Sequence, residues 1–412
     1  MGLKPAVILS LALTIIVLML LAYHPAWYFH LHTDANVYWA RANYFLNKWN
    51  FEGLVGNEYQ PGALIFFITL SPFLLINNTF QTYLSGLFSV NILLMFILVY
   101  LYKKYSDMKN VFLFALILLF TGPIVLFRFD LYVMSILIAS FLLWKKNQHI
   151  WATVTLAYAA LIKIFPIIFL PYYLIIEYKN KGLKNAIKIL LIFSVSYFSY
   201  ITVFSLVTDM NLPLILSSFG FIANTPVHTE STWAILTTLL WKVASGEFPK
   251  GAGAWGIFGI APQYQIGPLW FYNYFWIIPL VIFYLWLLVK IKSKEVVFDI
   301  RVCLSAILLF LLFSKILHHQ YTLWFMLLLP LIDWKIIFNN LRWTVMIFLT
   351  LMMTFINQYI YPLHFNELGH QFFVNGSFSY LFALIILRNL SLAVLVIGIM
   401  RELRLNIAKN NE

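Results

Sequence analysis

Long apolar runs separated by short polar segments recur along the whole chain. Twelve of these runs predict helices that cross a bilayer, although several are shorter than the roughly 20 residues that a membrane-spanning helix needs. The predicted spans lie near residues 5–23, 81–102, 111–127, 131–144, 149–164, 166–178, 187–207, 268–289, 298–317, 320–332, 343–361 and 378–398. Two further apolar stretches, 62–77 and 232–244, contain Ser71-Pro72 and Lys242. We expect these two to be re-entrant or interfacial helices on the outer side.

The composition excludes an ordinary soluble enzyme. The chain is 62% hydrophobic and 10% charged, whereas soluble chains are about 45–50% apolar and about 25% charged. Its single cysteine, Cys303, excludes an intramolecular disulfide framework and a thiolate metal cluster. The sequence therefore predicts an all-α polytopic membrane protein with one integral-membrane domain over residues 1–412.

The net charge of +12 is an orientation signal. With both termini in the cytoplasm, the twelve spans place 19 Lys+Arg and 7 Asp+Glu inside, and 8 of each outside or at membrane depth. Basic loops stay on the cytoplasmic side of a membrane. The expected partner of this charge is therefore the anionic lipid headgroup, and no nucleic acid is needed. The abundance of Lys, Ile, Asn and Phe favours a prokaryotic plasma membrane.

The outer side carries the long loops, at 24–61, 361–377 and 208–267, the last interrupted by the stretch 232–244. Long loops host function more often than short ones. Residues 34–48 have helical periodicity, which places Asp34, Tyr38 and Arg41 on one face. Asp34 or Thr33 could alternatively cap this helix at its N-terminus.

Other candidate residues follow at short outer turns. Arg128 and Asp130 flank Phe129 between two predicted spans, and Lys163 lies near the outer end of another. Charges at membrane depth are expensive and often functional, but a structural salt bridge is an equally good reading. Arg388 falls inside a predicted span, where it either pairs with a carboxylate or reaches a phosphate.

A further outer turn carries Lys315 and the pair His318-His319. Lys315 and His319 are four residues apart and can share a helical face. A zinc site is disfavoured, because adjacent histidines point to different faces of a helix and no His-Glu-x-x-His spacing occurs. These features together predict an outer polar cavity whose cations suit a lipid-linked phosphate and whose carboxylate suits a general base.

The ordered segments resemble a known superfamily. His32-Thr-Asp34-Ala-Asn-Val-Tyr38, followed by Tyr59-Gln60-Pro61-Gly62, resembles the first luminal loop of GT-C glycosyltransferases. Arg128-Phe129-Asp130 and Lys163-Ile-Phe-Pro166 resemble the Arg-x-Asp and Lys-x-x-Pro blocks of polyprenyl-phosphate-mannose-dependent mannosyltransferases. The segment from Phe313-Ser-Lys315 through Gln320-Tyr321-Thr-Leu-Trp324 resembles a block of glycosyltransferase family 87. The sequence departs from the usual pattern at Gln60, where proline or threonine is common, and no similar block follows Trp324.

This resemblance implies a metal-independent, inverting mannosyltransferase without a cofactor. The donor would be a polyprenyl-phosphate sugar, and the acceptor a lipid or glycan hydroxyl on the outer side. Asp34 would be the base, with His319 or His318 orienting the base or the acceptor. Arg128, Lys163 and Lys315 would hold the phosphate. The residues expected to contact sugars are Tyr38, Arg41, Glu58, Tyr59, Asp130, Gln320, Tyr321, His228 and Glu230.

Two other functions fit the same features. A transporter or flippase of a lipid-linked saccharide would share the cavity and its cations. Transporters often contain internal repeats, and none is seen in this sequence. A structural partner in an envelope complex would leave the outer histidines and Asp34 unexplained.

Overall fold

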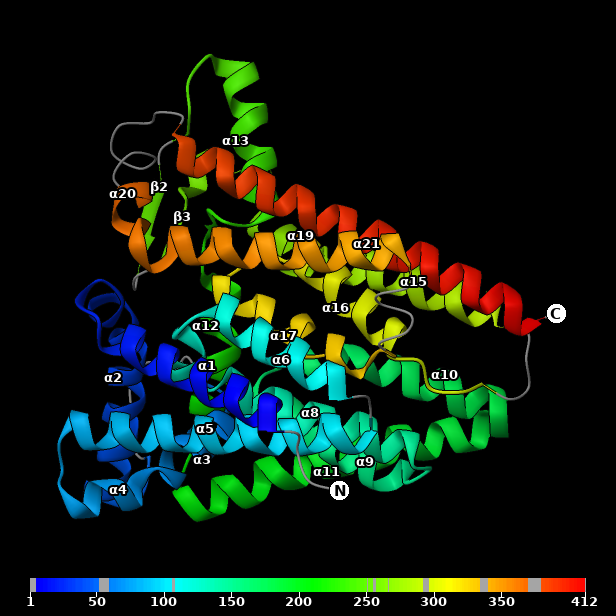
Figure 1. Ribbon diagram of the computed structural model, residues 1–412, viewed down its shortest axis with the longest axis horizontal. Helices are drawn as coiled ribbons and strands as arrows, with labels where there is room; N and C mark the ends of the chain where they lie inside the picture. Colours follow the sequence, from blue (N-terminus) through cyan, green and yellow to red (C-terminus); the bar gives the residue numbers. More distant parts are fainter. Residues whose placement is uncertain are drawn as a thin grey trace. The chain divides into compact units, whose positions relative to one another are not determined.

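The chain is predominantly helical (Figure 1), which confirms the predicted all-α class. The computed structural model describes residues 5–51, 59–105, 108–249, 251–254, 257–265, 267–291, 296–333, 340–369 and 379–411. Strands β1 (Val227–His228), β2 (Gly251–Ala254) and β3 (Ile257–Ile260) form a small antiparallel sheet in the order β1-β3-β2. This sheet lies within residues 208–267, which the sequence predicts to be an outer loop without strands.

Five helical segments among the described residues are long and apolar enough to cross a membrane. They are Phe80–Tyr105, Leu183–Thr208, Trp270–Lys290, Leu341–Leu363 and Tyr380–Arg404. A sixth candidate is the pair Val7–Tyr23 and Pro25–Lys48, whose axes differ by 87°. Shorter apolar helices cover Pro61–Ile76, Lys109–Thr121, His149–Ile162 and Ile300–Phe313. The membrane character of the chain is thus supported by the length and composition of its helices.

Several predicted spans are broken into shorter helices. Residues 111–127 form α6 (Met108–Thr121) and α7 (Ile124–Phe127), because Gly122, with φ of 67°, and Pro123 interrupt the helix. Residues 320–332 form η3 (His319–Tyr321), α17 (Thr322–Met326) and η4 (Leu329–Leu331), where Pro330 lies within the last turn. The predictions of one continuous helix over each of these two segments are wrong.

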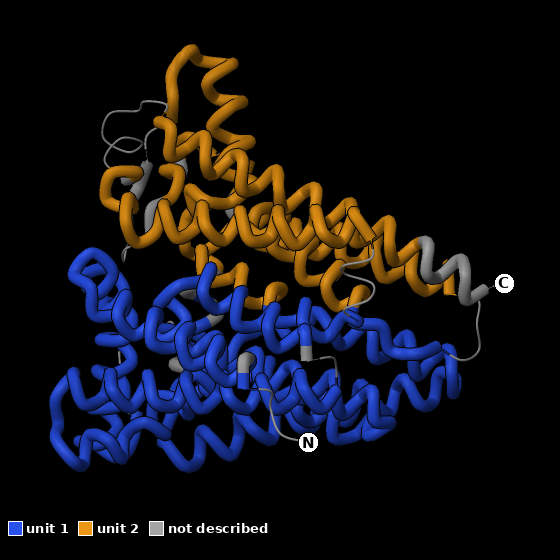
Figure 2. Tube along the Cα trace, viewed as in Figure 1, with its two compact units in different colours: residues 1–222, 293–300, 327–334 blue, residues 223–292, 301–326, 335–412 orange. Residues whose placement is uncertain are grey.

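The chain forms two compact units, shown in Figure 2, within the predicted single domain. Unit 1 comprises Met1–Ile222, Ser293–Ile300 and Leu327–Trp334, and unit 2 comprises Ala223–Lys292, Arg301–Met326 and Lys335–Glu412. The chain therefore passes between the two units several times.

In unit 1, the short helix α3 packs closely against the end of α9. A Cβ atom added to Gly62 would lie 2.7 Å from the backbone nitrogen of Ile162 and 2.8 Å from the carbonyl oxygen of Leu161. Glycine is required where two backbones approach this closely. Besides α6, α7 and η4, the described helices of this unit are α1 (Pro5–Tyr23), α2 (Pro25–Lys48), α3 (Pro61–Thr69), α4 (Ser71–Ile76), α5 (Phe80–Tyr105), α8 (Asp130–Lys145), α9 (His149–Ile162), η1 (Phe165–Phe169), α10 (Leu170–Lys181), α11 (Leu183–Thr208) and most of α12 (Leu212–Asn224).

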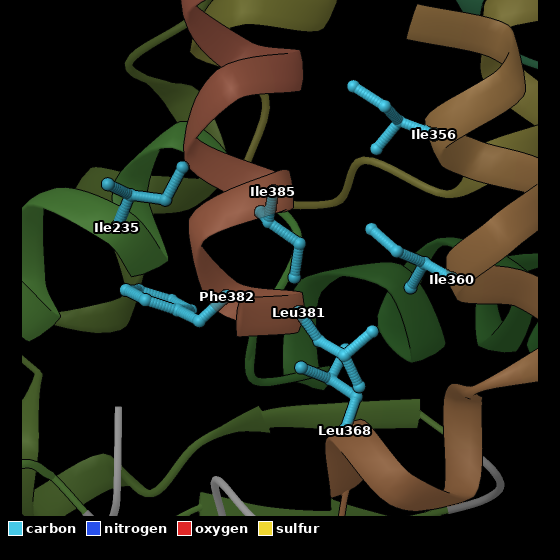
Figure 3. Close-up of a cluster of buried hydrophobic side chains, with 7 residues drawn as sticks. All are labelled: Ile235, Ile356, Ile360, Leu368, Leu381, Phe382 and Ile385. Carbon is cyan, nitrogen blue, oxygen red and sulfur yellow. The ribbon is translucent and has the colours of Figure 1, made fainter. Parts of the chain in front are cut away.

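In unit 2, helices α19 and α21 run side by side (Figure 1). Apolar side chains from α13, α19, η5, α20 and α21 form a buried cluster (Figure 3), which contains Ile235, Ile356, Ile360, Leu368, Leu381, Phe382 and Ile385. The helical elements of this unit are α13 (Thr232–Ser245), η2 (Pro262–Tyr264), α14 (Leu269–Tyr274), α15 (Ile277–Lys290), α16 (Ile300–Phe313), η3, α17, α19 (Leu341–Gln358), η5 (Tyr359–Leu363), α20 (Phe365–Gly369) and α21 (Tyr380–Asn411). This cluster holds α19 and α21 together beside the buried polar residues described below.

Candidate functional site

Asp34 lies in the middle of helix α2. The helix begins at Pro25, and the backbone N–H of Ala26 donates to Nδ1 of His24, at 3.3 Å. Proline is favoured at the first helical position, because its missing N–H has no helical partner there anyway. The alternative in which Thr33 or Asp34 caps the helix is therefore wrong, and the carboxylate of Asp34 is available for another interaction.

That interaction is an ion pair with Arg128. Arg128 lies in the turn between α7 and α8, where its side chain is 6% exposed, while that of Asp34 is 36% exposed. Buried Asn91 of α5 donates from Nδ2 to the carbonyl oxygens of Leu126 and Arg128, at 2.8 and 3.1 Å. The asparagine thus fixes the backbone that carries the guanidinium.

A second ion pair lies two residues further along the same turn. Lys163 Nζ, just after α9, donates to Oδ1 of Asp130 at 2.6 Å, and it lies 4.6 Å from the centre of the Phe129 ring. Asp130 is fully buried in the first turn of α8, where the helix dipole favours a carboxylate. A buried carboxylate needs such a partner, because desolvation of an isolated charge is costly.

Aromatic rings surround these pairs. The Tyr38 ring stacks on Phe67 with centroids 4.4 Å apart and meets Phe129 edge-on at 5.5 Å. Tyr59 also meets Tyr38 edge-on, at 5.5 Å. The structure thus places both predicted tyrosines beside the Arg128–Asp130 turn. Arg41 lies in α2, less than one turn after Tyr38 and partly exposed, whereas Glu58 lies outside the described residues.

Unit 2 contains a separate buried polar cluster centred on Glu230 and Arg388. Glu230, in the turn after β1, is fully buried, and Arg388 of α21 is 1% exposed. Arg388 Nη1 donates to Glu230 Oε2 at 2.5 Å and to Asn357 Oδ1 at 3.0 Å, and Nη2 donates to the Glu230 carbonyl oxygen. Arg388 Nε donates to Asn389 Oδ1 at 3.0 Å. Of the two roles considered for Arg388, the structure thus shows pairing with a carboxylate.

The charges in this cluster reinforce one another. Burial acts to raise the pKa of Glu230, but Arg388, together with His319 and His228, outweighs that effect and holds the pKa well below its usual range. Burial lowers the pKa of His228, and the opposing effect of Glu230 is smaller. Glu230 is therefore ionised and His228 neutral near pH 7.

The histidines of the predicted outer turn lie around this cluster. His319 stacks on Tyr361 with ring centroids 3.6 Å apart, and its Nδ1 lies 4.0 Å from Glu230 Oε1. The half-buried ring of His318 lies 4.4 Å from the ring of His228.

Lys315 does not share a helical face with His319. Helix α16 ends at Phe313, and the five residues before η3 are not helical. Lys315 Nζ donates to the carbonyl oxygens of Ala223 and Thr225, at 3.0 and 2.7 Å. These two bonds hold the Lys315 side chain against the backbone of Ala223 and Thr225. Because the segment between Lys315 and His319 is not helical, the prediction that they share a helical face is wrong. Gln320 and Tyr321 lie in η3, where Tyr321 stacks on Trp324 at 4.0 Å.

Three asparagines that position these charges escape the sequence-based prediction. Asn91 supports the Arg128 turn, and Asn357 and Asn389 bind Arg388. All three are buried polar residues inside long apolar helices. Since buried polar groups are almost always hydrogen-bonded, this position alone is the signal that could have identified them.

The predicted site residues thus fall into two groups, one within each unit. In the described part of the chain, no three His, Cys, Asp or Glu side chains lie close enough together to hold a metal ion. No protein-family model and no curated protein sequence matches the chain.

Proposed function

We propose that the protein is a GT-C-type membrane glycosyltransferase. It transfers a sugar, mannose by resemblance, from a polyprenyl-phosphate donor to a hydroxyl of a lipid or glycan acceptor. The observation that carries this proposal is the convergence in unit 1 of Asp34, Arg128, Asp130 and Lys163 from three separate segments of the chain. A partly exposed carboxylate paired with Arg128, with Lys163 bound to Asp130 in the same turn, suits base catalysis at a phosphate leaving group.

In the proposed reaction, an acceptor hydroxyl attacks the anomeric carbon of the donor sugar. Asp34 takes the hydroxyl proton as the new glycosidic bond forms. The bond between the anomeric carbon and the phosphate oxygen breaks on the opposite face, so the configuration inverts, and polyprenyl phosphate leaves. Arg128 and Lys163 stabilise the negative charge that grows on the phosphate.

The ion pairs give this reaction an order of events. Arg128 holds Asp34 before the donor binds. A donor phosphate competes for the same guanidinium, since Arg binds carboxylates and phosphates in the same planar manner. Donor binding therefore releases the Asp34 carboxylate to accept the acceptor proton. The rings of Tyr38 and Phe129 are buried beside the ion pairs, whereas the partly exposed ring of Tyr59 suits contact with the sugar or the isoprenoid.

We extend the proposal to the membrane arrangement. Six shorter or broken segments, α6–α7, α8, α9, η1–α10, α16 and η3–α17–η4, would add six crossings to the six long candidates and bring the total to twelve. The basic loops and both termini would face the cytoplasm of a prokaryotic plasma membrane, and Asp34 would face outward.

The test is an in vitro assay of the purified protein with a panel of polyprenyl-phosphate sugars and membrane-lipid acceptors, with analysis of product linkage. We expect one donor to be consumed and an inverted linkage to form. Movement of a lipid-linked saccharide across proteoliposomes without any new glycosidic bond would instead establish the flippase alternative.

A further inference from the structure

His228 is a buried imidazole in strand β1. His228 is only 1% exposed, and neither of its ring nitrogens has a hydrogen-bond partner among the described residues. Its backbone N–H donates to the Lys315 carbonyl oxygen at 2.9 Å, so the strand position is fixed independently of the ring. A buried polar group without a partner is costly for folding. Such groups tend to persist where function needs them.

Glu230 presents a second polar atom of the same kind two residues away. Arg388 binds Oε2 and the backbone carbonyl, and the described residues provide no hydrogen bond to Oε1. Asn389 Nδ2 also donates to the Glu230 carbonyl oxygen, at 3.0 Å. Glu230 is therefore held from one side, while its Oε1 faces His319 Nδ1 at 4.0 Å, a separation wide enough that Oε1 can still accept a hydrogen bond from a ligand.

The electrostatics of the cluster exclude an anionic ligand. Four of the five N–H groups of Arg388 donate to protein oxygens. The Lys315 ammonium donates to two carbonyl oxygens. Glu230 and Arg388 neutralise each other, and His228 is uncharged. A phosphate in this cluster would meet an ionised carboxylate and cations that are already bound, whereas a neutral ligand meets no such penalty.

We infer that His228 and Glu230 form a binding site for adjacent hydroxyl groups of a neutral saccharide. A neutral imidazole offers one donor and one acceptor nitrogen, and Glu230 Oε1 adds a second acceptor. Each sugar hydroxyl can both donate and accept, so two neighbouring hydroxyls satisfy all three atoms. The half-buried His318, whose ring contacts His228, is the side chain that must turn to admit the sugar. This inference rests on the proposed function in one respect only, namely whether the bound saccharide is part of the donor or of the acceptor.

The test measures binding directly and needs no transfer reaction. The probe is methyl α-mannopyranoside, added to the full-length protein in detergent and followed by saturation-transfer NMR. We expect binding to the wild-type protein, and at least tenfold weaker binding to the His228→Phe variant. Inorganic phosphate should not compete. Asp34→Asn, which removes only the proposed base, should bind the probe as the wild type does. The binding result therefore tests the saccharide site even if the protein proves not to be a transferase.

A second measurement on the same variant separates a ligand site from a structural one. His228→Phe replaces the imidazole by a somewhat larger apolar ring and removes two buried nitrogens that lack hydrogen bonds within the described part of the chain, so without ligand it should raise the melting temperature by a few degrees. Weaker binding together with higher stability supports the inference. Unchanged probe binding in His228→Phe, or lower stability with no probe binding to the wild type, would overturn it.

Discussion

The carboxylate of Asp34, in the middle of α2, forms an ion pair with the guanidinium of Arg128, in the turn before α8. The two side chains differ in exposure, because Asp34 is 36% exposed and Arg128 only 6%. The cation is fixed by its surroundings, and the carboxylate approaches it from the accessible side. A ligand that reaches this pair therefore meets the acid group first.

Replacement of Asp34 by asparagine should abolish transfer. Loss of a general base reduces rates by about 10²–10⁴-fold, while the amide keeps the size of the side chain and can still accept a bond from Arg128. Donor binding and folding should be retained. The measurement is product formation with saturating donor. Asp209→Asn is the matched control, because Asp209 is exposed and its left-handed backbone, with φ of 50°, suits asparagine equally well. Wild-type turnover by Asp34→Asn would assign the base elsewhere.

Replacement of Lys163 by alanine should weaken donor binding at least tenfold, because one of two cations beside the leaving group is lost. This variant also leaves the buried Asp130 carboxylate without its lysine partner, which can impair folding. The double variant Lys163→Ala with Asp130→Asn removes both charges and so separates the effect on donor binding from the effect on folding. Donor affinity is measured by titration of the polyprenyl-phosphate sugar. Lys184→Ala serves as control, because Lys184 is an exposed lysine in the first turn of α11. Equal donor affinity in all four proteins would move the phosphate away from Lys163.

Replacement of Gly62 by alanine should destabilise unit 1 by about 1–3 kcal/mol, the usual cost of overpacking. The added Cβ would lie 2.7 Å from the backbone nitrogen of Ile162, where little can move. Activity should fall with stability, because Lys163 directly follows this contact. Gly220→Ala is the control, since no atom lies within 4 Å of its Cβ position and it lies in helix α12. Thermal unfolding of the two variants makes the comparison, and equal melting temperatures would rule out the close packing.

The Arg388–Glu230 pair should behave as a buried pair. Arg388→Met leaves a buried carboxylate unpaired and should cost about 3–5 kcal/mol, whereas Arg388→Met with Glu230→Met should cost clearly less. The pair of Arg342 and Glu402, at 3.1 Å, is the control, because the Arg342 side chain is 50% exposed although that of Glu402 is only 10% exposed. Arg342→Met should therefore cost clearly less than Arg388→Met. Additive effects of the two single substitutions in the first pair would show that these groups do not interact.

The stability of the protein should depend on pH through His228. Burial lowers the pKa of the folded-state imidazole below the ordinary histidine value of about 6.5, so below pH 6.5 the unfolded chain binds more protons than the folded one. Stability contributed by the neutral ring is therefore present above pH 6.5 and lost as the pH falls through and below that value. Melting curves from pH 7.5 to 5.5 should show a smaller decrease for His228→Phe than for the wild type. Parallel curves would contradict this assignment.

Much of unit 1 could be predicted from the sequence because its charges stand out against apolar surroundings. Arg128, Asp130 and Lys163 each lie at the end of a predicted helix, and the structure brings them together at helix ends. The start of α2 at Pro25 was harder to predict from the sequence. Histidine is an unusual N-cap residue, and the residues before Pro25 merge with the first apolar segment. The helix breaks at Gly122-Pro123 and Pro330 follow from the backbone preferences of glycine and proline, which a hydropathy profile does not include.

The cluster in unit 2 could be predicted only in part. An arginine in an apolar helix demands an anion, but the sequence does not say that Glu230 provides it, since no local spacing relates the two residues. Strand β2 was not predictable, because Gly251–Ala254 consists of glycine and alanine, which have low strand propensity. Strand β3, Ile257–Ile260, contains residues that favour strands, but its four residues are too few to establish an alternating pattern. Tertiary contacts decide both features.

Residues 327–334 belong to unit 1 although most of that unit is made from the first 222 residues. Tyr102 Oη donates to the Leu327 carbonyl oxygen at 2.6 Å, and Asn110 Nδ2 donates to those of Pro330 and Ile332, at 2.9 and 2.8 Å. During synthesis, these two buried side chains must wait until about four-fifths of the chain has left the ribosome before their acceptors exist. Unit 1 therefore cannot be completed from its first 222 residues alone, and its folding depends on a segment that is synthesised late.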